Sequence, residues 1–502
     1  MTLKQNLSRY LDAGFPILYI DTFEEMKIEE TIKEIADRRT ICTWSMAAGY
    51  GEYSTKTNEW IVPVSKEDNT DIMSVLNLKL FDNSEMNRTI FIIKDAHIVL
   101  EDKNAVTALK EMALRISTGV DSCIILLSPV VSIPVELEKY ITILQGDYLT
   151  FEDICNIIDE FVESNGLSKL TTSLRDEMAM AFKGLSQFEI ENLLALAVAD
   201  DGSLSRKDLN LIFEQKKQMI LKSGVLEMIP LKETIEDIGG LENLKEWLKR
   251  KSKVIKNMHN AEKFGVDTPK GVLIAGVPGC GKSLCAKAAA KLFEVPLLRL
   301  DVGKLMGKYL GESEANLRKA INLAEAISPC ILWVDELEKA FAGIGTDGGH
   351  EVTTRLFGSF LTWMQEKKGA AFVVATANDI TKLPPELLRK GRFDEIFYVG
   401  LPKENERRKI FEIHIEKRRK NDLSKINIRD LVLKSNGYSG ADIEGVVKEA
   451  VEYAFANDKT ELTTEDILNV IKDTHSLSEI MKESIEKMTK EYETRKFKNA
   501  SL

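Results

Sequence analysis

The sequence predicts an α/β protein in which helices cover both faces of parallel sheets, an arrangement that occurs twice along the chain. Short apolar runs alternate with helical patterns in both halves, as in parallel sheets with covering helices. A glycine-rich turn in the second half, GVPGCGKS at 276–283, joins an apolar run to a helical pattern. Each half then ends in a stretch with helical patterning alone. We therefore expect two three-layer α/β/α domains, each followed by a helical part.

The first half, residues 1–225, contains strand-like runs without a phosphate-binding loop. Apolar runs of the buried-strand type cover residues 16–22, 89–96 and 123–129, and helical patterns cover 24–38 and 105–116. The segment Asp21–Glu25 stands where a phosphate loop would be, and its carboxylates would repel a phosphate. Because the pattern is all-helical from about residue 150, we predict a sheet part over 1–149 and a helical part over 150–225.

The segment 271–283 predicts a nucleotide-binding loop. The apolar run Val272–Ala275 leads into G-x-x-x-x-G-K-S, and a helical pattern follows. The glycines let successive backbone N–H groups point inward, and the N-terminus of the next helix adds partial positive charge. In such a loop Lys282 reaches the outer phosphates of ATP and Ser283 holds Mg²⁺. The other expected nucleotide contacts of this loop are Pro278, Gly279, Cys280, Gly281 and Leu284.

Further strands of the second half are predicted at 296–301, 330–336, 371–378 and 396–400. Pro402 and the charged run after it mark a change to helices that ends near Asp473. We predict a large α/β subdomain over 226–400, a helical lid subdomain over 401–475 and a helical tail over 476–502. The tail has many charges and no Gly or Pro, which favours a docking helix over a core element.

Two carboxylates at the end of the strand at 330–336 predict the metal and catalytic residues. Asp335 and Glu336 would lie at the C-terminal edge of the sheet, where ligands bind. We expect Asp335 to organise Mg²⁺ and its waters, and Glu336 to polarise the water that attacks the γ-phosphate. Asn378, which ends the next strand, could position the same water through its amide.

Two arginines, Arg389 and Arg392, lie beside a glycine in the segment LPPELLRKGRFD at 383–394. Arginines in such a turn usually lie in solvent, but here they could stabilise charge on a phosphate as trans-acting arginine fingers.

Residues 232–475 resemble the AAA family of the AAA+ ATPases. GVPGCGKS and WVDE look like the nucleotide motifs of that family, and ATAN with LLRKGRFD looks like its second region of homology. The resemblance implies a P-loop NTPase fold with a C-terminal helical lid. It also implies that Arg389 and Arg392 are fingers that reach the nucleotide of a neighbouring subunit.

The resemblance assigns further contacts around the nucleotide. It places Asp237, Ile238 and Gly239 against the adenine, and His414, Gly440 and Ala441 at the lid side of the site. Taken alone, a histidine on a helix such as His414 is more often a packed surface residue than a ligand, but its spacing in IFEIH matches the family. The segment 437–442 independently predicts a turn and a helix N-cap.

The segment 307–312 lies between two predicted strands and contains Lys308, Tyr309 and Leu310. The tyrosine could pack under its own loop. The family resemblance implies instead a first pore loop, in which Tyr309 and Leu310 grip an extended polypeptide in the channel of a hexamer. The glycine-rich segment 343–349 would be a second, mobile central loop.

The two halves can be compared directly. Lys94-Asp95-Ala96 parallels Val334-Asp335-Glu336, residues 133–137 parallel 383–387, and residues 184–186 parallel 437–439. On that alignment the first half is a degenerate AAA+ module with Ala96 in place of the catalytic Glu and Pro129 near the position of Asn378. We expect it to serve in assembly or partner binding without hydrolysing ATP, although chance similarity between α/β folds is an alternative.

Such a pairing of a degenerate and an active module resembles AAA proteins encoded in plastid and cyanobacterial genomes, whose bacterial relatives are similar to the stage V sporulation protein K.

Composition limits the other function classes. Hydrophobic residues make up 44% of the 502 residues and charged residues 29%, which is ordinary for a globular chain. The net charge of −11 argues against non-specific binding to nucleic acid or acidic membranes as the main activity. The cysteines show no metal-ligand spacing, and no run of 18 apolar residues or signal-peptide pattern occurs. We expect a soluble protein of the cytoplasm or of a compartment like the plastid stroma.

The sequence therefore predicts an ATP-hydrolysing, ring-forming remodeller of proteins, with ATP and Mg²⁺ as its cofactors. The expected partners are further copies of the chain, in a hexamer by family resemblance, and an unidentified protein substrate or adaptor. Two alternatives stay open. The chain could be an ATP-gated assembly switch or scaffold in a stress or defence pathway, or an AAA+ motor that acts on nucleic acid.

Overall fold

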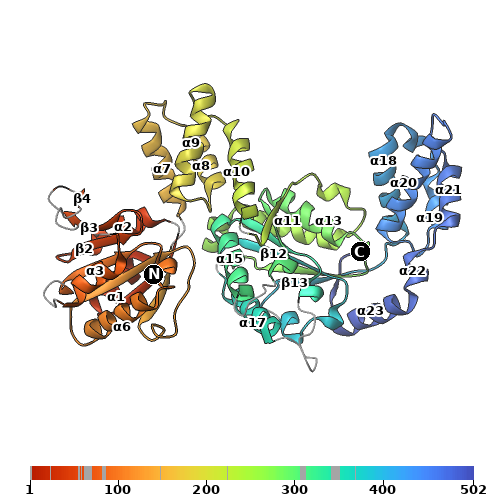
Figure 1. Ribbon diagram of the computed structural model, residues 1–502. Coiled ribbons are helices and arrows are strands. Elements are labelled where there is room, and N and C mark those ends of the chain that lie inside the picture. Colours follow the sequence, from red (N-terminus) through yellow and green to blue (C-terminus); the bar gives the residue numbers. More distant parts are fainter. Residues whose placement is uncertain are drawn as a thin grey trace. The chain divides into compact units, whose positions relative to one another are not determined.

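The computed structural model describes residues 3–22, 24–54, 57, 59–61, 70–81, 86–146, 149–222, 224–305, 312–340, 351–367, 369–389 and 391–502. The chain divides into two compact units (Figure 1). The first unit comprises residues 1–180 and 185–204, and the second comprises residues 181–184 and 205–502. Helix α10 (Asp208–Lys222), which we predicted with the first half, thus belongs to the second unit, where it contacts β8 (Leu226–Ile229).

The first unit is built on a sheet with the strand order β4-β3-β2-β5-β6-β1-β7 in its described residues. The strands are β1 (Ile17–Asp21), β2 (Thr40–Ser45), β3 (Gly49–Ser54), β4 (Glu59–Ile61), β5 (Thr89–Ile93), β6 (Ser122–Ser128) and β7 (Ile141–Gln145). In the part of the sheet ordered β2-β5-β6-β1-β7, all neighbouring strands pair in parallel. At the other edge, β3 pairs antiparallel with β2 and with β4. The central strands β5 and β6 are buried along their whole length, as in a sheet covered on both faces.

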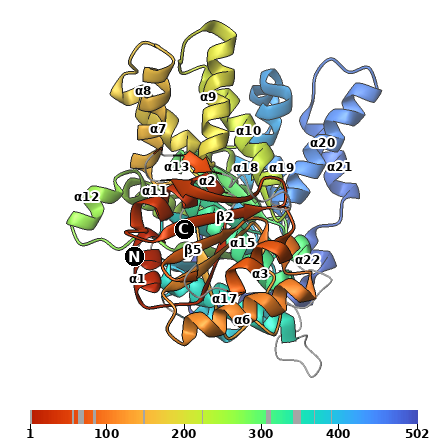
Figure 2. The same cartoon turned by 60° about the vertical axis from the view of Figure 1, so that its left-hand side comes forward.

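Helices cover both faces of this sheet. They are α1 (Leu3–Asp12), α2 (Glu25–Ile35), α3 (Ile72–Phe81), α5 (Ala96–Val99) and α6 (Lys103–Ser117). Alternate residues of β1 point to opposite faces: Leu18 and Ile20 pack with α1 and α2, while Ile17 and Tyr19 pack with α3 and α6. The helices α7 (Phe151–Ser164), α8 (Thr172–Phe182) and α9 (Gln187–Asp201) follow, and α7 lies beside α9 (Figure 2).

The second unit repeats this topology. Its strands are β8, β9 (Gly271–Gly276), β10 (Leu297–Leu300), β11 (Cys330–Val334), β12 (Ala371–Ala377), β13 (Glu395–Val399) and β14 (Lys498–Asn499). The order β10-β11-β12-β9-β13 matches the order β2-β5-β6-β1-β7 of the first sheet, and all these pairs are parallel. The similarity predicted between the two halves is therefore present in the path of the chain.

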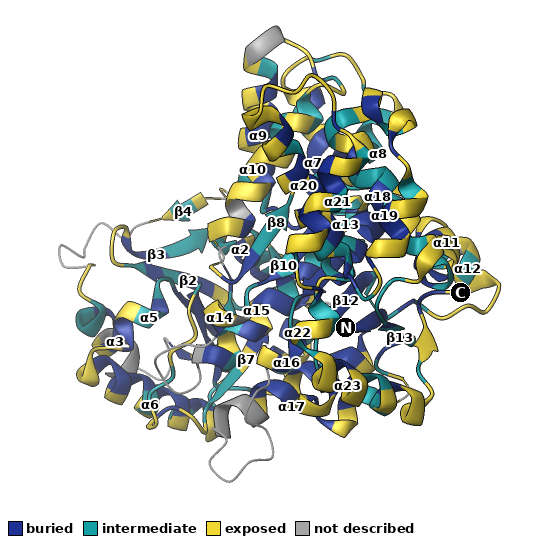
Figure 3. Cartoon of the chain, turned by 90° about the vertical axis from the view of Figure 1, so that its right-hand side faces the viewer, coloured by how far each residue is buried: buried dark blue, intermediate teal, exposed yellow. Residues whose placement is uncertain are grey.

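The second sheet is also covered on both faces. Its helices are α11 (Glu242–Lys256), α12 (Met258–Lys263), α13 (Lys282–Phe293), α14 (Val302–Leu305), α15 (Glu312–Ile327), α16 (Leu337–Ala340) and α17 (Glu351–Glu366). Val272 and Ile274 pack with α11 and α13, and Leu273 and Ala275 pack with α15 and α17. Figure 3 shows buried strands between helices whose outer faces are exposed.

The lid subdomain forms its own core after β13. Its helices are α18 (Glu404–Arg419), α19 (Ile428–Lys434), α20 (Gly440–Ala456) and α21 (Thr464–Asp473). Phe411, Ile443 and Val447 are among its fully buried side chains. Short 3₁₀ helices lie at Ile235–Asp237, Ile380–Lys382, Pro385–Leu388 and Lys420–Lys425. The predicted three-layer α/β/α fold with a C-terminal helical lid is confirmed.

The tail consists of α22 (Leu477–Ile480), α23 (Lys482–Arg495) and β14. The prediction of a docking helix outside the core was wrong. Ile485, Met488 and Tyr492 of α23 are buried in the core of the second unit, and the Tyr492 ring stacks on Tyr398 of β13 with centroids 4.2 Å apart. These residues form a narrow apolar stripe at helical spacing. The stripe is hard to recognise in the sequence because charged residues cover the other faces of α23.

Candidate nucleotide-binding site

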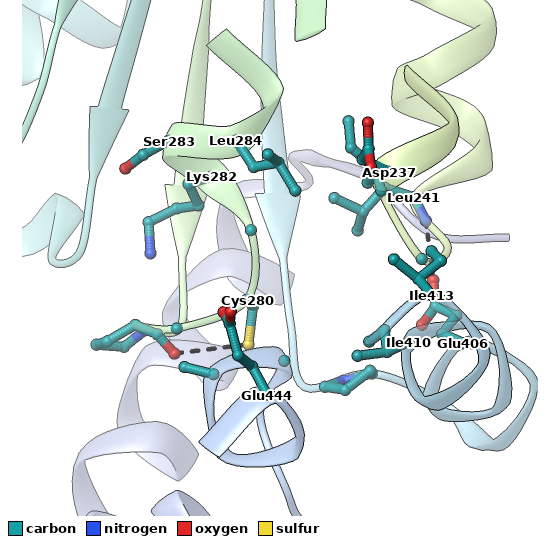
Figure 4. A pocket seen from close by; sticks show the side chains of 18 of the residues that line it. Asp237, Leu241, Cys280, Lys282, Ser283, Leu284, Glu406, Ile410, Ile413 and Glu444 are labelled. Carbon is teal, nitrogen blue, oxygen red and sulfur yellow. Dashed lines mark hydrogen bonds between the residues drawn. The ribbon is translucent and has the colours of Figure 1, made fainter. Parts of the chain in front are cut away.

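A cavity of about 560 Å³ lies in the second unit between the phosphate loop, the turn before α11 and the lid helices α18 and α20 (Figure 4). Its volume lies within the range of small-molecule sites. The structure brings these predicted residues together in its lining: Asp237, Ile238, Gly239, Pro278, Gly279, Cys280, Gly281, Lys282, Ser283, Leu284, Asp335, Glu336, Asn378, His414, Gly440 and Ala441.

Lys282 lies at the floor of this cavity. Its Nζ donates hydrogen bonds to Gly276 O at 2.9 Å and to Val277 O at 2.8 Å. Burial lowers the pKa of Lys282, and nearby acidic groups, including the Asp335 carboxyl, oppose that shift. Among the described residues no carboxylate forms an ion pair with it, so an arriving phosphate would supply the charge that burial leaves uncompensated.

The phosphate loop and the lid meet closely at Gly279. Its φ of +73° lies in the left-handed region, and an added Cβ would approach Ala441 Cβ and Ser439 Oγ to 3.0 Å. The Ala441 N–H donates to Gly279 O at 2.9 Å, and Ser439 caps α20 by accepting the Asp442 N–H. A backbone hydrogen bond thus joins the phosphate loop to the first turn of α20 in the lid.

The carboxylate end of the site is a hydrogen-bonded cluster. Asp335 Oδ1 accepts the Ser283 hydroxyl at 3.3 Å and also the hydroxyl of Thr376 on β12. The Glu336 N–H donates to Thr376 Oγ1 at 3.2 Å, and the Asn378 amide donates to Glu336 Oε1 at 3.4 Å. Sequence reasoning missed Thr376, for which the signal was a hydroxyl within an otherwise apolar buried strand.

Ser283 and Asp335 suit Mg²⁺ in their chemistry. Both present hard oxygen donors, which Mg²⁺ prefers when water and substrate phosphates complete its shell. In the part of the chain that the structure describes, no group of three His, Cys, Asp or Glu side chains forms an all-protein metal cage. A metal held here would therefore rely on the ligand for much of its coordination.

The opposite wall is apolar and was only partly predicted. The turn at 237–241 lies so close to α18 that a Cβ on Gly239 would clash with Ile410. Figure 4 shows Leu241 facing Ile410 and Ile413 on this side of the cavity. Glu406, Ile410 and Ile413 follow a helical spacing on α18, one turn apart, and that periodicity was the available signal.

His414 and Cys280 complete the lining near the lid. Burial lowers the pKa of His414, with Arg418 and Lys417 acting in the same direction and Glu444 opposing them. Burial raises the pKa of the Cys280 thiol to about 11, so it is protonated near neutral pH and lies 3.6 Å from Pro278 O.

The two predicted arginine fingers lie outside this lining. Arg389 and Arg392 do not line the cavity of their own chain; Arg389 is exposed, and the Arg392 guanidinium donates to Glu386 O. The predicted pore-loop residues Lys308, Tyr309 and Leu310 and the segment 343–349 lie outside the described residues.

The first unit has a different set of groups at the equivalent position. β5 ends at Ile93 as β11 ends at Val334, and the second residue after each strand is left-handed, with φ of +50° at Asp95 and +49° at Glu336. Lys94 therefore occupies the position of Asp335, and Asp95 that of Glu336. The predicted match of Ala96 to Glu336 was wrong by one residue. The sequence comparison aligned the two aspartates, Asp95 and Asp335, whereas the strand ends and the left-handed residues after them align Asp95 with Glu336.

Lys94 is neutralised within the first unit. Its Nζ lies 2.6 Å from Glu29 Oε1 and 3.8 Å from Glu25 Oε2, both on α2. The first unit thus has the ammonium group of Lys94 at the position where the second unit has the Asp335 carboxylate, which is suited to Mg²⁺.

The loop before α2 is also too short to cradle phosphates. The strand pairings equate Thr22 with Gly276, yet α2 begins three residues after Thr22 while α13 begins six residues after Gly276. Glu24 Oε1 accepts the N–H of Gln187, the first residue of α9, at 2.8 Å. The bond joins the segment before α2 to the first turn of α9, much as the bond between Gly279 and Ala441 joins the phosphate loop to the first turn of α20.

Comparison with known proteins agrees with this geometry. Family models match four segments: the ATPase family associated with various cellular activities (AAA) at 272–401, the N-terminal domain of SpoVK-like AAA ATPases at 3–146, their second domain at 152–223, and the AAA+ lid domain at 425–469. No helix among the described residues has the length and apolar character to cross a membrane.

Relatives match over nearly the whole chain. The "Uncharacterized AAA domain-containing protein ycf46" of Guillardia theta is 38% identical over 97% of this chain and 94% of its own length. The protein of the same name from Pyropia yezoensis is 36% identical over the full length of both. The proteasome-activating nucleotidase of Methanococcus vannielii is 33% identical over 51% of this chain and 63% of its own length. This chain therefore belongs to the SpoVK-like AAA ATPases, nucleotide-binding enzymes that hydrolyse ATP.

Proposed function

We propose that this ATPase forms a ring in which ATP lies between neighbouring protomers, and that ATP turnover remodels or unfolds a protein substrate. The observation that carries the ring is the position of Arg389 and Arg392. They belong to the segment that follows β12, yet they do not line the cavity of their own chain. A neighbouring copy would give them a nucleotide to contact.

Each residue of the cavity then has a proposed role. The loop amides and Lys282 bind the outer phosphates, while Leu241, Ile410 and Ile413 provide an apolar wall for the base. Glu336 takes the proton of the attacking water as general base, and the Asn378 amide orients the Glu336 carboxylate. Ser283 and Asp335 would hold Mg²⁺, which when bound neutralises charge on the phosphates.

The protein substrate is inferred from two features. A relative that shares half of the chain is named a proteasome-activating nucleotidase, and this name supports action on proteins. The sequence at 308–310, Lys-Tyr-Leu, resembles a loop that grips polypeptides, although it lies outside the described residues.

Mixed assemblies test the shared site. We expect chains with Arg389→Ala and Arg392→Ala to lose at least about a hundredfold in ATPase rate, as do Lys282→Ala chains, because each lacks one half of the site. Mixing the two variants should restore part of the activity, since one supplies a pocket and the other supplies fingers. Lys382→Ala, which removes an exposed cation nearby, is the control. Activity that is independent of concentration in a proven monomer would contradict the ring.

Glu336→Gln tests the general base. The amide keeps the size of the side chain but cannot take a proton, so the variant should bind ATP and hydrolyse it about a hundred to a thousand times more slowly. Single-turnover hydrolysis and equilibrium binding of ATP measure the two steps separately. Glu366→Gln, at an exposed position of α17, should leave both unchanged. Wild-type hydrolysis in Glu336→Gln chains would remove this residue from the mechanism.

Tyr309→Ala separates the proposed function from an assembly switch. A remodeller should lose unfolding of a model protein substrate while it keeps basal ATPase activity. A switch should show no unfolding in either chain and the same ATPase activity in both. Unfolding followed by substrate fluorescence, beside ATPase rates, provides the comparison.

A further inference from the structure

Residues 498–501, which we call the strap, run from the edge of the second sheet to the rim of the cavity. β14 pairs in parallel with β13, so that Asn499 lies opposite Tyr398. The buried Ala500 donates its N–H to Tyr398 O at 2.8 Å and accepts the N–H of Leu244 on α11 at 3.2 Å. The strap is thus fixed on one side to the sheet and on the other to α11.

The strap ends on Glu406, a residue that lines the cavity. Ser501 is 8% exposed, and its hydroxyl donates to Glu406 Oε1 at 2.7 Å. The Asn243 amide donates to Ser501 O at 2.7 Å and so fixes its backbone. Ser501 itself does not line the cavity, and therefore any effect it has there acts through Glu406.

Glu406 connects the strap to two further segments. Its Oε1 also accepts the N–H of Leu241 at 3.0 Å, and its Oε2 accepts the N–H of Lys403 at 2.9 Å (Figure 4 shows the bond to Leu241). One carboxylate therefore joins the strap, the turn before α11 and the start of the lid. Hydrogen bonds to an ionised acceptor are the stronger kind, and three donors restrict its rotamer.

At this junction the turn before α11 packs closely against α18. A Cβ on Gly240 would clash with Glu406 Oε1, and one on Gly239 would clash with Ile410. A displaced Glu406 carboxylate would release the Leu241 N–H and let the turn separate from α18. The distance between Leu241 and Ile410, which form the apolar wall, would then no longer be fixed.

We propose that Ser501 is a positioning residue for nucleotide binding, which holds the Glu406 carboxylate so that the turn at 238–241 and α18 form a preorganised wall for the base. The proposal rests on the nucleotide cavity of the proposed function. It assigns the strap to affinity for the nucleotide and not to the chemical step, because Figure 4 shows Glu406 across the cavity from Ser283, whose hydroxyl is bonded to Asp335.

Equilibrium binding of ADP that carries a fluorescent N-methylanthraniloyl group tests this in the full-length chain. Ser501→Ala should raise the dissociation constant about threefold to tenfold, less than the full effect of one lost hydrogen bond to a charged acceptor, because Ser501 acts on the nucleotide only through Glu406. The KM for ATP should rise with it, and kcat should stay unchanged. Ser501→Thr keeps the hydroxyl and should restore affinity. Thr494→Ala removes an exposed hydroxyl of α23 and should behave as wild type.

Hydrogen exchange provides a readout that does not depend on activity. In nucleotide-free Ser501→Ala the amide of Leu241 should exchange faster, whereas the amide of Ala441, bonded to Gly279, should not change. Equal affinity of Ser501→Ala and wild type would overturn the proposal. So would a lowered thermal unfolding midpoint with unchanged affinity, which would give Ser501 a stabilising role only. Failure of the wild type itself to bind the probe would instead count against the proposed function.

Discussion

At the scale of single residues, His414 shows how the lid sets the charge of a group in the cavity. Its Nδ1 lies 3.3 Å from Arg418 Nη1 and 3.8 Å from Glu444 Oε1. Because burial is the largest cause of its lowered pKa, the neutral imidazole is favoured in the folded protein. Near neutral pH the side chain thus presents an uncharged ring beside the wall formed by Ile410 and Ile413.

This shift predicts a pH dependence of stability. The ordinary pKa is 6.5 and the folded value lies below it, so the unfolded chain binds this proton more readily. The stabilisation that neutral His414 gives the folded protein is complete above pH 6.5. It is lost as the pH falls through the pKa of His414 in the folded protein. Between about pH 7.5 and 5.5, the urea midpoint of the wild type should therefore fall more than that of His414→Gln. Parallel profiles of the two chains would mean that His414 titrates normally.

The site residues that belong to recognisable motifs could be predicted from the sequence, whereas Thr376 and Glu406 could not. Lys282 and Ser283 follow from a motif whose spacing alone defines the loop. Thr376 and Glu406 have roles that depend on which strand or turn lies beside them, and that information resides in the fold. The mismatch at Ala96 arose in the same way, since a difference of one residue in register is invisible without the strand pairing.

At the scale of elements, burial decided which strands were predictable. The central strands β5, β6, β9, β11 and β12 are apolar on both faces and were all predicted near their observed bounds. The apolar residues of β2, with the sequence TICTWS, are interrupted by a threonine, and β14 has only two residues, so neither gave a continuous apolar run. The pairing of β14 with β13 joins residues about a hundred positions apart, which no local pattern reports.

Helix α23 predicts a measurable contribution to the core. Replacing the buried Tyr492 by Ala removes its stacking on Tyr398 and leaves a cavity, which should cost about 3–5 kcal/mol of unfolding free energy in the second unit. Chemical denaturation measures this loss. Lys487→Ala, on the exposed side of the same helix, should change it by less than about 0.5 kcal/mol. Unaltered stability of Tyr492→Ala would contradict a contribution of this ring to the core.

At the scale of the whole molecule, the two units share one topology but differ at the position of the nucleotide. The first unit has a shortened loop and an internal cation, Lys94, paired with the carboxylates of α2. We therefore predict one nucleotide per chain, bound by the second unit. Lys282→Ala should abolish all binding of labelled ADP, while Lys94→Ala should leave the stoichiometry at one. Calorimetric titration measures the number of ADP molecules bound per chain in each variant. Residual binding in Lys282→Ala chains would reveal a second site.

The bond from Glu24 to the first turn of α9 has a consequence for the working cycle. In the second unit, the contact between phosphate loop and lid lies in the lining of the cavity, so an exchange of ATP for ADP there would act on it directly. In the first unit the chain itself supplies the anion. If the first unit binds no nucleotide, as predicted above, this bond should persist through the whole ATPase cycle, and a partner bound by the first unit should be held with equal affinity in the ATP and ADP states.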